Sequence, residues 1–154
     1  MLRLLALTTL TLTLVPAVPL AQVGGSLTAG PPVELHLELT TGSDGPQLSV
    51  TDFELITGEY YRLNVTSDGV ETWRLEVDEL LRNSHLRLVT ISEIEVHLQA
   101  LAFRAIEFDV AGMVQFSFTP VRPGTFAFTV GDTPSETRRR GGAGRVARGR
   151  FVVE

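Results

Sequence analysis

Apolar and polar residues alternate over most of the chain after residue 32, with the period of two that is typical of strands buried on one face. The clearest example is the stretch 115–130, in which two alternating runs flank a connection, 119–125, that contains two prolines and a glycine. Such a connection favours a tight turn. We therefore predict a β-hairpin here, with four phenylalanines in the core: Phe116, Phe118, Phe126 and Phe128.

Shorter runs of the same kind continue through the chain, separated by Gly, Pro, Asp and Ser. They lie at 33–40, 48–56, 60–65, 73–77, 86–91, 95–101, 103–110 and 149–153. Residues 78–83 allow one helical turn, but no stretch outside the N-terminal segment shows sustained helical periodicity. Short strands in this number and spacing predict an all-β fold, a Greek-key antiparallel β-sandwich in which two sheets share one core.

Residues 1–21 have a different pattern. Arg3 precedes a largely apolar, uncharged run, LLALTTLTLTLVPAV, and the segment then ends at Ala21. A basic start, an apolar middle and a small-residue end are typical of a secretory signal peptide. A retained membrane anchor is the alternative, although the run is shorter than the ~20 residues that a spanning helix needs. We predict cleavage after Ala21, a flexible leader at 22–32, one domain at 33–154, and a periplasmic or secreted location.

Composition narrows the class of protein. The chain has 154 residues, of which 44% are hydrophobic and 20% charged, enough for one sizeable core. All 13 basic residues are arginine, and the 18 acids give a net charge of −5, so nucleic acid is not expected as a partner. Because the sequence has no cysteine, it can form no disulfide and supplies no thiolate as a metal ligand or nucleophile.

Four segments follow one another in an order shared with a known family: FELITGEYYRLNVTSDG, TWRLEV, IEFDVAGMVQFSFTPVRPGTFAFTV and GRFVVE. Together they extend over about residues 48–154 and resemble the cupredoxin-like domain of exported bacterial proteins. The shared pattern is a strand ending in a turn, a strand that opens with a ligand position, a Pro-Gly hairpin that leads to a ligand loop, and a closing Gly-x-Val-Val-like strand. The resemblance implies a Greek-key β-sandwich.

The resemblance also implies a type 1 copper centre, which needs two histidines, a cysteine and usually a methionine. Two imidazoles, a thiolate and a weak axial sulfur stabilise copper in both oxidation states. This sequence departs from the pattern, because Trp73 occupies the first histidine position, Val130 the cysteine position, and Ala147 falls near the methionine position. The loop between, 131–146, contains no histidine. We therefore expect the family's fold with a degenerate copper site and no copper cofactor.

Other residues offer a different copper site as the alternative. Its ligands would be His85, His97 and Met113, with His85 in a loop near Trp73, and the chain would then be a periplasmic copper-binding or electron-transfer protein. However, His36 and His97 each lie on the polar face of a predicted strand, without a second histidine at i+2 or i+4. That pattern is more typical of solvated histidines than of a metal centre. We therefore expect no metal ligands.

The segment 137–150, TRRRGGAGRVARGR, has six arginines and no acid. A charge run of this kind is most often a solvated loop. The sharper interpretation is a docking loop, because arginine binds carboxylate and phosphate groups through two parallel hydrogen bonds. The candidate docking residues are Arg138, Arg139 and Arg140, together with Arg145.

Catalytic motifs are missing from the sequence, which has no nucleophile elbow, no phosphate-binding glycine loop with lysine and no HExxH. We expect no catalytic residues and no enzyme activity. The sequence therefore predicts an exported cupredoxin-like binding or accessory module without a type 1 copper centre. Its expected partner is an acidic envelope protein or an anionic surface, bound through the arginine-rich segment.

Overall fold

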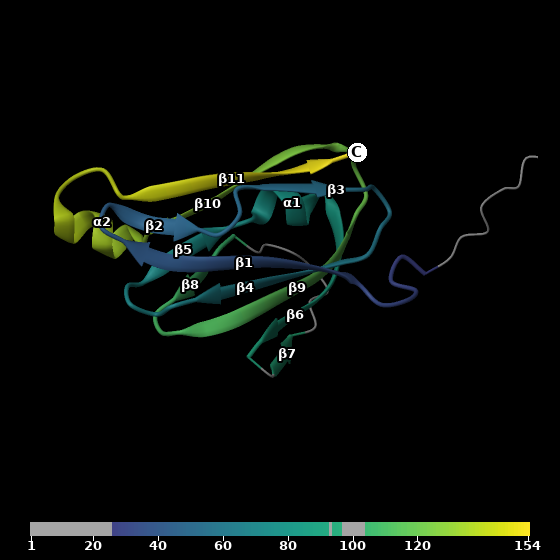
Figure 1. Ribbon diagram of the computed structural model, residues 1–154, viewed down its shortest axis with the longest axis horizontal. Helices are drawn as coiled ribbons and strands as arrows, with labels where there is room; N and C mark the ends of the chain where they lie inside the picture. The colour runs from purple at the N-terminus through teal and green to yellow at the C-terminus, as the bar shows by residue number, and fades with distance from the viewer. Residues whose placement is uncertain (1–25, 93, 97–103) are drawn as a thin grey trace, which may run out of the picture.

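The computed structural model describes residues 26–92, 94–96 and 104–154, and its strands form two facing sheets (Figure 1). The predicted signal peptide and part of the leader lie outside the described residues, as do His97 and most of the predicted strand at 95–101. Neither described helix is long and apolar enough to cross a membrane. The architecture is the β-sandwich that the alternating pattern predicted.

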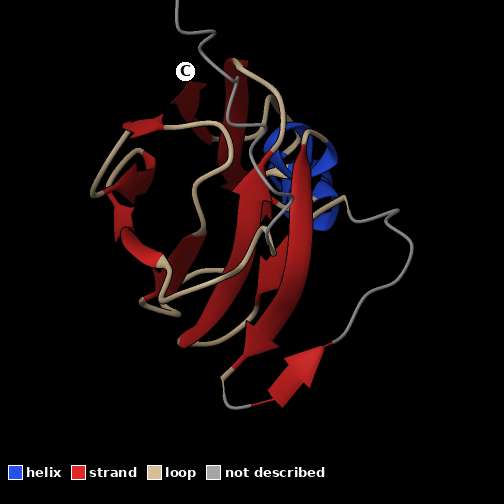
Figure 2. Ribbon diagram, turned by 90° about the vertical axis from the view of Figure 1, so that its right-hand side faces the viewer, coloured by secondary structure: helices blue, strands red, loops and turns tan. Residues whose placement is uncertain are grey.

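The first sheet has the strand order β2-β1-β4-β9-β6-β7, and the second has the order β3-β11-β10-β5-β8. The strands of the first sheet are β1 (Val33–Gly42), β2 (Gly45–Leu48), β4 (Tyr61–Ser67), β6 (Ser84–Ile91), β7 (Ile94–Val96) and β9 (Gly112–Pro120). Those of the second are β3 (Asp52–Leu55), β5 (Trp73–Glu76), β8 (Ile106–Phe108), β10 (Gly124–Asp132) and β11 (Val146–Val153). Two short helices, α1 (Asp78–Arg82) and α2 (Pro134–Arg140), complete the described chain and are blue in Figure 2. The predicted helical turn at 78–83 is confirmed as α1.

Each sheet contains one parallel pair of strands, so the sandwich is mixed rather than purely antiparallel. β1 runs parallel to β4, and β3 runs parallel to β11. In both pairs the chain visits the opposite sheet before it returns, and such a crossover allows two strands to run in the same direction. The predicted strand at 48–56 is divided for the same reason: β2 lies in the first sheet and β3 in the second.

The predicted hairpin at 115–130 is wrong in its pairing, although both of its strands exist. β9 pairs with β4 and β6, whereas β10 pairs with β5 and β11. Both edges of each strand are therefore occupied, and residues 121–123 carry the chain from one sheet to the other. Alternation could not reveal this, because it indicates which face of a strand is buried and not which strand lies beside it.

Aromatic side chains from both sheets fill the space between the layers. Phe116 and Phe118 of β9 and Phe128 of β10 are at most 1% exposed, as predicted, while Phe126 is only half-buried. The ring centroid of Phe128 lies 5.1 Å from that of Phe151 on β11. Because rings from the two sheets are buried in one cluster, the core joins the layers along their length.

Candidate functional site

Helix α2 forms just after β10, within residues 131–146, for which the sequence predicts a loop. Thr133 is the N-cap, and its hydroxyl accepts a hydrogen bond from the backbone N–H of Glu136 at 3.2 Å. Pro134 follows at the start of the helix, and Gly141 ends it with a φ of 66°. These residue types favour a helix start and a helix end. The loop prediction is therefore corrected to a short, capped helix between two turns.

Arg145 is the centre of an ionic cluster at the α2 end of the sandwich. Its Nη2 donates to Asp132 Oδ1 at 2.7 Å, and its backbone N–H donates to Asp132 Oδ2 at 2.8 Å. Nη2 also donates to Glu71, and the guanidinium carbon lies 4.8 Å from the centroid of the Trp73 ring. The Asp132 side chain is 0% exposed and that of Arg145 is 19% exposed. Arg140 joins the group, with Nη2 3.3 Å from Glu71 Oε2. These five residues are called the Arg145 cluster below.

Strand register explains why residues so far apart in the chain meet here. β10 lies between β5 and β11, and Asp132 at its end is directly opposite Trp73 of β5. On the other side, the pairing of Gly131 with Val146 brings Arg145 beside Asp132, whose N–H donates to the Arg145 carbonyl at 3.0 Å. Side chains that oppose one another across a sheet share a face. The buried Trp73 shows that this face is the inner one.

Trp73 extends the cluster into the first sheet. Its indole Nε1 donates to Thr41 Oγ1, on β1, at 3.1 Å. The backbone N–H of Thr41 in turn donates to Asp68 Oδ2 at 2.7 Å, just beyond the end of β4. Because β1 and β4 belong to the first sheet and β5 to the second, these contacts form a polar connection between the layers.

Hydrogen bonds from Arg145 lower the pKa of two carboxyl groups. They are the main cause for both Asp132 and Glu71, and they outweigh burial, which acts to raise both pKa values. The hydrogen bond to Asp132 in turn raises the pKa of the Arg145 guanidinium above its usual value. All three groups are therefore charged at neutral pH, as a stabilised ion cluster requires.

The three positions that match copper ligands in the family lie on neighbouring strands of the second sheet. Val130 pairs directly with Ala147 on one side and with Leu75 on the other. Trp73 lies two residues before Leu75 on the same face, so it opposes Asp132 rather than Val130. Trp73 and Val130 are both 0% exposed. The structure thus gathers the three positions at the α2 end, as buried or half-buried packing residues.

These residues do not fit a type 1 copper centre. That centre needs imidazole nitrogens and a thiolate, whereas Val130 and Ala147 have no donor atom and the indole N–H of Trp73 can only donate a hydrogen bond. The carboxylates of Asp132 and Glu71 belong to the same cluster as Trp73, and Arg145 already binds both. Within residues 26–92, 94–96 and 104–154, no group of three or more His, Asp or Glu side chains could hold a metal ion.

The alternative copper ligands are not brought together by the described fold. His85 on β6 lies opposite Thr119, near the end of β9, and Met113 lies near the other end of the same strand. Thr119 and Met113 are six positions apart on the strand, which corresponds to about 20 Å at ~3.4 Å per residue. The expectation that His85 lies near Trp73 is wrong, because β6 begins at the opposite end of the sandwich from α2. His36 is exposed on β1.

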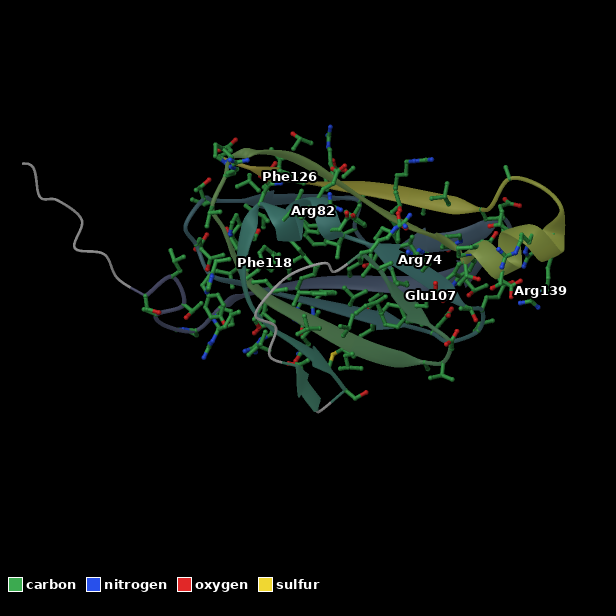
Figure 3. The ribbon with its side chains drawn as sticks, turned by 180° about the vertical axis from the view of Figure 1, so that it is seen from behind. Arg74, Arg82, Glu107, Phe118, Phe126 and Arg139 are labelled. Atoms are coloured by element: carbon green, nitrogen blue, oxygen red, sulfur yellow. The ribbon has the colours of Figure 1, made fainter. Side chains whose placement is uncertain are left out.

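The structure divides the candidate docking arginines into two kinds. Arg138, Arg139 and Arg140 form the last turn of α2, and Figure 3 shows Arg139 at the tip of the molecule. The Arg139 side chain is 71% exposed and pairs only at the surface, with Glu136. Arg140 is 45% exposed and faces the cluster, and Arg145 points inward. The sequence did not distinguish these environments, because all the arginines lie in one acid-free run.

A polar pocket of about 260 Å³ lies beside α2. Its lining residues are Gly69, Val70, Glu71, Thr72, Asp109, Glu136 and Arg140. Two of its three carboxylates already pair with arginines, since Glu71 binds Arg145 and Glu136 binds Arg139. The pocket therefore presents mixed charge, and the exposed Arg138 and Arg139 of α2 are not among its lining residues.

Comparison with solved structures identifies the fold. A multicopper oxidase that functions in iron import, Fet3p, is 13% identical with a TM-score of 0.56, and the match covers 84% of this chain and 29% of that one. The copper nitrite reductase of Nitrosomonas europaea is 10% identical with a TM-score of 0.53, covering 84% of this chain and 52% of that one. The nitrite reductase of Thermus scotoductus SA-01 is also 10% identical with a TM-score of 0.53, covering 81% and 31%.

The chain thus spans between 29% and 52% of the length of these three proteins. No protein-family model matches it, and no curated protein is similar enough to count as a relative. At sequence identities of 10–13%, these matches show a shared fold and give no information on function. The fold is a cupredoxin-like β-sandwich, in agreement with the resemblance that the sequence indicated.

Proposed function

We propose that this protein is a cupredoxin-like binding or accessory module that works without a type 1 copper centre and docks onto an anionic partner through α2. The observation that carries the proposal is the presentation of three consecutive arginines, Arg138, Arg139 and Arg140, in the exposed last turn of a capped helix. Segments at the end of a rigid sandwich are where binding residues gather, because the scaffold fixes their position while their sequence is free to vary.

Helix geometry separates the roles of these arginines. Successive residues of a helix point about 100° apart, so the three side chains cannot share one direction. Arg140 turns toward Glu71 in the Arg145 cluster. Arg139 has only a surface partner, and pairs of that kind contribute little. We therefore assign docking to Arg138 and Arg139, while Arg140 and Arg145 serve the structure of this end.

The partner that suits this surface carries carboxylate or phosphate groups, as an acidic envelope protein or an anionic membrane surface does. The remainder of the chain is acidic, with a net charge of −5 overall, so attraction to anions is concentrated at α2. We propose export to the periplasm or beyond, on the basis of the signal-like residues 1–21. A binding role suits this end better than catalysis, because most of its charged groups pair with one another.

The docking proposal is tested with two matched double variants. Arg138→Ser with Arg139→Ser removes two exposed charges from α2, and Arg82→Ser with Arg122→Ser removes two exposed charges from the opposite end. The measurements are binding to vesicles that contain phosphatidylglycerol, co-purification of envelope proteins, and the melting temperature. The α2 variant should lose about tenfold in affinity without a change in melting temperature, and wild-type binding should weaken as salt screens charges beyond ~10 Å.

Unchanged vesicle binding and unchanged co-purified proteins at low salt would contradict the docking proposal. Equal losses in both double variants would also contradict it, because they would show dependence on net charge rather than on α2. Loss of co-purified protein with unchanged vesicle binding would identify an acidic protein as the partner.

The proposed absence of a type 1 centre is tested by titration with copper. A blue copper band arises from sulfur-to-copper charge transfer, and the sequence has no cysteine. We expect no intense visible band in the copper-loaded protein, and its appearance would overturn this part of the proposal. Tight stoichiometric copper binding without the band would instead support the alternative, a copper-binding or electron-transfer protein with non-standard ligands.

A further inference from the structure

The Arg145 cluster lies where segments from both sheets meet. Trp73 begins β5, Asp132 ends β10, Arg145 immediately precedes β11, and Glu71 lies in the connection before β5. The indole of Trp73 adds β1 of the first sheet through Thr41. One guanidinium therefore contacts three segments of the second sheet and is connected to the first through a single ring.

We propose that the Arg145 guanidinium takes the place of a metal ion as the cross-link at this end of the fold. A metal centre would join these strand ends by placing several ligands around one cation, but the residues present do not suit copper. Arginine provides a cation that is charged at all relevant pH values, with donors in a planar fork that match carboxylates and a flat face that stacks on an aromatic ring. Arg145 uses all of these features, toward Asp132, Glu71 and Trp73.

The aliphatic part of Arg145 also contacts the first sheet directly. A Cβ added to Gly45 of β2 would lie 3.0 Å from the Cβ of Arg145, so the arginine stem packs against the backbone at this position. Gly45 has a φ of 140°, which a residue with a side chain rarely adopts. The glycine thus provides both the conformation and the space that the cross-link needs.

Burial makes this cross-link different from an ordinary surface ion pair. The Asp132 side chain is fully buried, so removal of the guanidinium would take the closest charged partner from a buried carboxylate, which would keep only the Arg145 backbone N–H at 2.8 Å and the more distant Arg140 Nε at 4.0 Å. The chain contains a matched surface pair, because Arg150 of β11 contacts Asp52 of β3 at 2.5 Å with side chains 62% and 52% exposed. Pairs with that exposure usually contribute little to stability.

The test is a pair of double-mutant cycles measured by thermal unfolding. The first uses Arg145→Met and Asp132→Asn, and the second uses Arg150→Met and Asp52→Asn. Each single change in the first cycle should lower the melting temperature by roughly 10 °C. The decrease in the double variant should be clearly smaller than the sum of the two single decreases. Each change in the control cycle should shift the melting temperature by about 2 °C or less, and the shift of the double variant should equal the sum of the two single shifts. Arg145→Lys keeps the positive charge but removes the planar set of guanidinium donors. It replaces Arg145→Met in the cycle if the Met variant does not fold.

Additive effects at Arg145 and Asp132, or effects no larger than those of the control cycle, would overturn the proposal.

A second experiment tests for a bound metal: neither EDTA nor one equivalent of Cu(II) should change the melting temperature of the wild-type protein. A melting temperature that falls with EDTA would show a resident metal and would also overturn it. The inference is independent of the docking function, because Arg138 and Arg139 take no part in either cycle.

Discussion

At the α2 end of the sandwich, a charged cluster on the second sheet is connected to the first sheet through Trp73 and Thr41, whereas at the opposite end Tyr61 of β4 is hydrogen-bonded to Ile56, which follows β3. The Arg145 cluster contains two arginines and two carboxylates around Trp73. At the other end, the Tyr61 hydroxyl donates to Glu59 Oε2 at 2.6 Å and accepts from the Ile56 N–H at 2.9 Å. The backbone N–H of Gly58 donates to the Pro120 carbonyl at 2.8 Å, which joins β9 to the segment before β4.

The two ends should therefore lose stability under different conditions of pH. The α2 end depends on carboxylates that must stay ionised, so acid should weaken it. The Tyr61 end depends on a phenol that must stay protonated, so alkali should weaken it. Between them lies an apolar core that neither condition affects directly. Substitutions in these three regions are therefore expected to differ in size and in pH dependence.

The largest effect is expected from the core that both ends share. Phe128 is 1% exposed and packs against Phe53 and Phe151. Phe128→Ala should lower the free energy of unfolding by ~3–5 kcal/mol, because it removes buried surface and leaves a cavity. Chemical denaturation measures this loss, and hydrogen exchange should show both ends destabilised together. A midpoint equal to that of the wild type would show that the assigned facing of β10 is wrong.

Acid should weaken the α2 end selectively. The folded pKa values of Asp132 and Glu71 lie below their unfolded values, so their stabilisation is complete above about pH 5 and is lost as the pH falls through the lowered pKa values. Asp132→Asn should cost ~1.5–3 kcal/mol at pH 7, the range for hydrogen bonds to charged groups. The difference from wild type, measured by urea unfolding at several pH values, should shrink below about pH 4. If the free energy of unfolding differed between wild type and Asp132→Asn by the same amount down to pH 2, the ion pair between Asp132 and Arg145 would not be the source of the stabilisation.

Glycine substitutions compare the packing at the two ends. Gly45 at the α2 end has Arg145 against it, whereas Gly58 at the opposite end has a φ of 84° and no atom within 4 Å of an added Cβ. Both alanine variants incur backbone strain, of about 1–3 kcal/mol each, because both glycines have a positive φ. Gly45→Ala should lose a further ~1–2 kcal/mol because it displaces the Arg145 stem. Equal losses in denaturant unfolding would show that the arginine stem is not fixed there.

The smallest effect is expected from Tyr61. Burial, assisted by the hydrogen bond to Glu59, raises its pKa to about 12. Because the folded pKa is above the unfolded one, this stabilisation is complete below about pH 10 and is lost as the pH rises through 12. Tyr61→Phe should cost ~1 kcal/mol at neutral pH and should abolish the late step in an ultraviolet titration of tyrosine. Retention of that step in the variant would contradict the assignment of the raised pKa to Tyr61.

The sequence predicted the strands well because alternation is a local property. Phe116, Phe118 and Phe128 were placed in the core by their period alone, and the turn at 78–83 was recognisable as α1. The signals for α2 were also local, in Thr133, Pro134 and Gly141, but the many glycines and arginines around them favoured a loop. The capping residues nevertheless start and end a helix within this segment.

Residue types and their spacing were enough to predict the β-sandwich, the apolar core and the absence of a thiolate. Only the tertiary structure decided which strands are neighbours, and therefore that Arg145 meets Glu71, 74 residues away, over Trp73. An arginine in a polar run has the same local pattern whether it faces solvent or a buried carboxylate. What distinguishes the two cases is the register of β10 between β5 and β11, which packing of the whole domain sets.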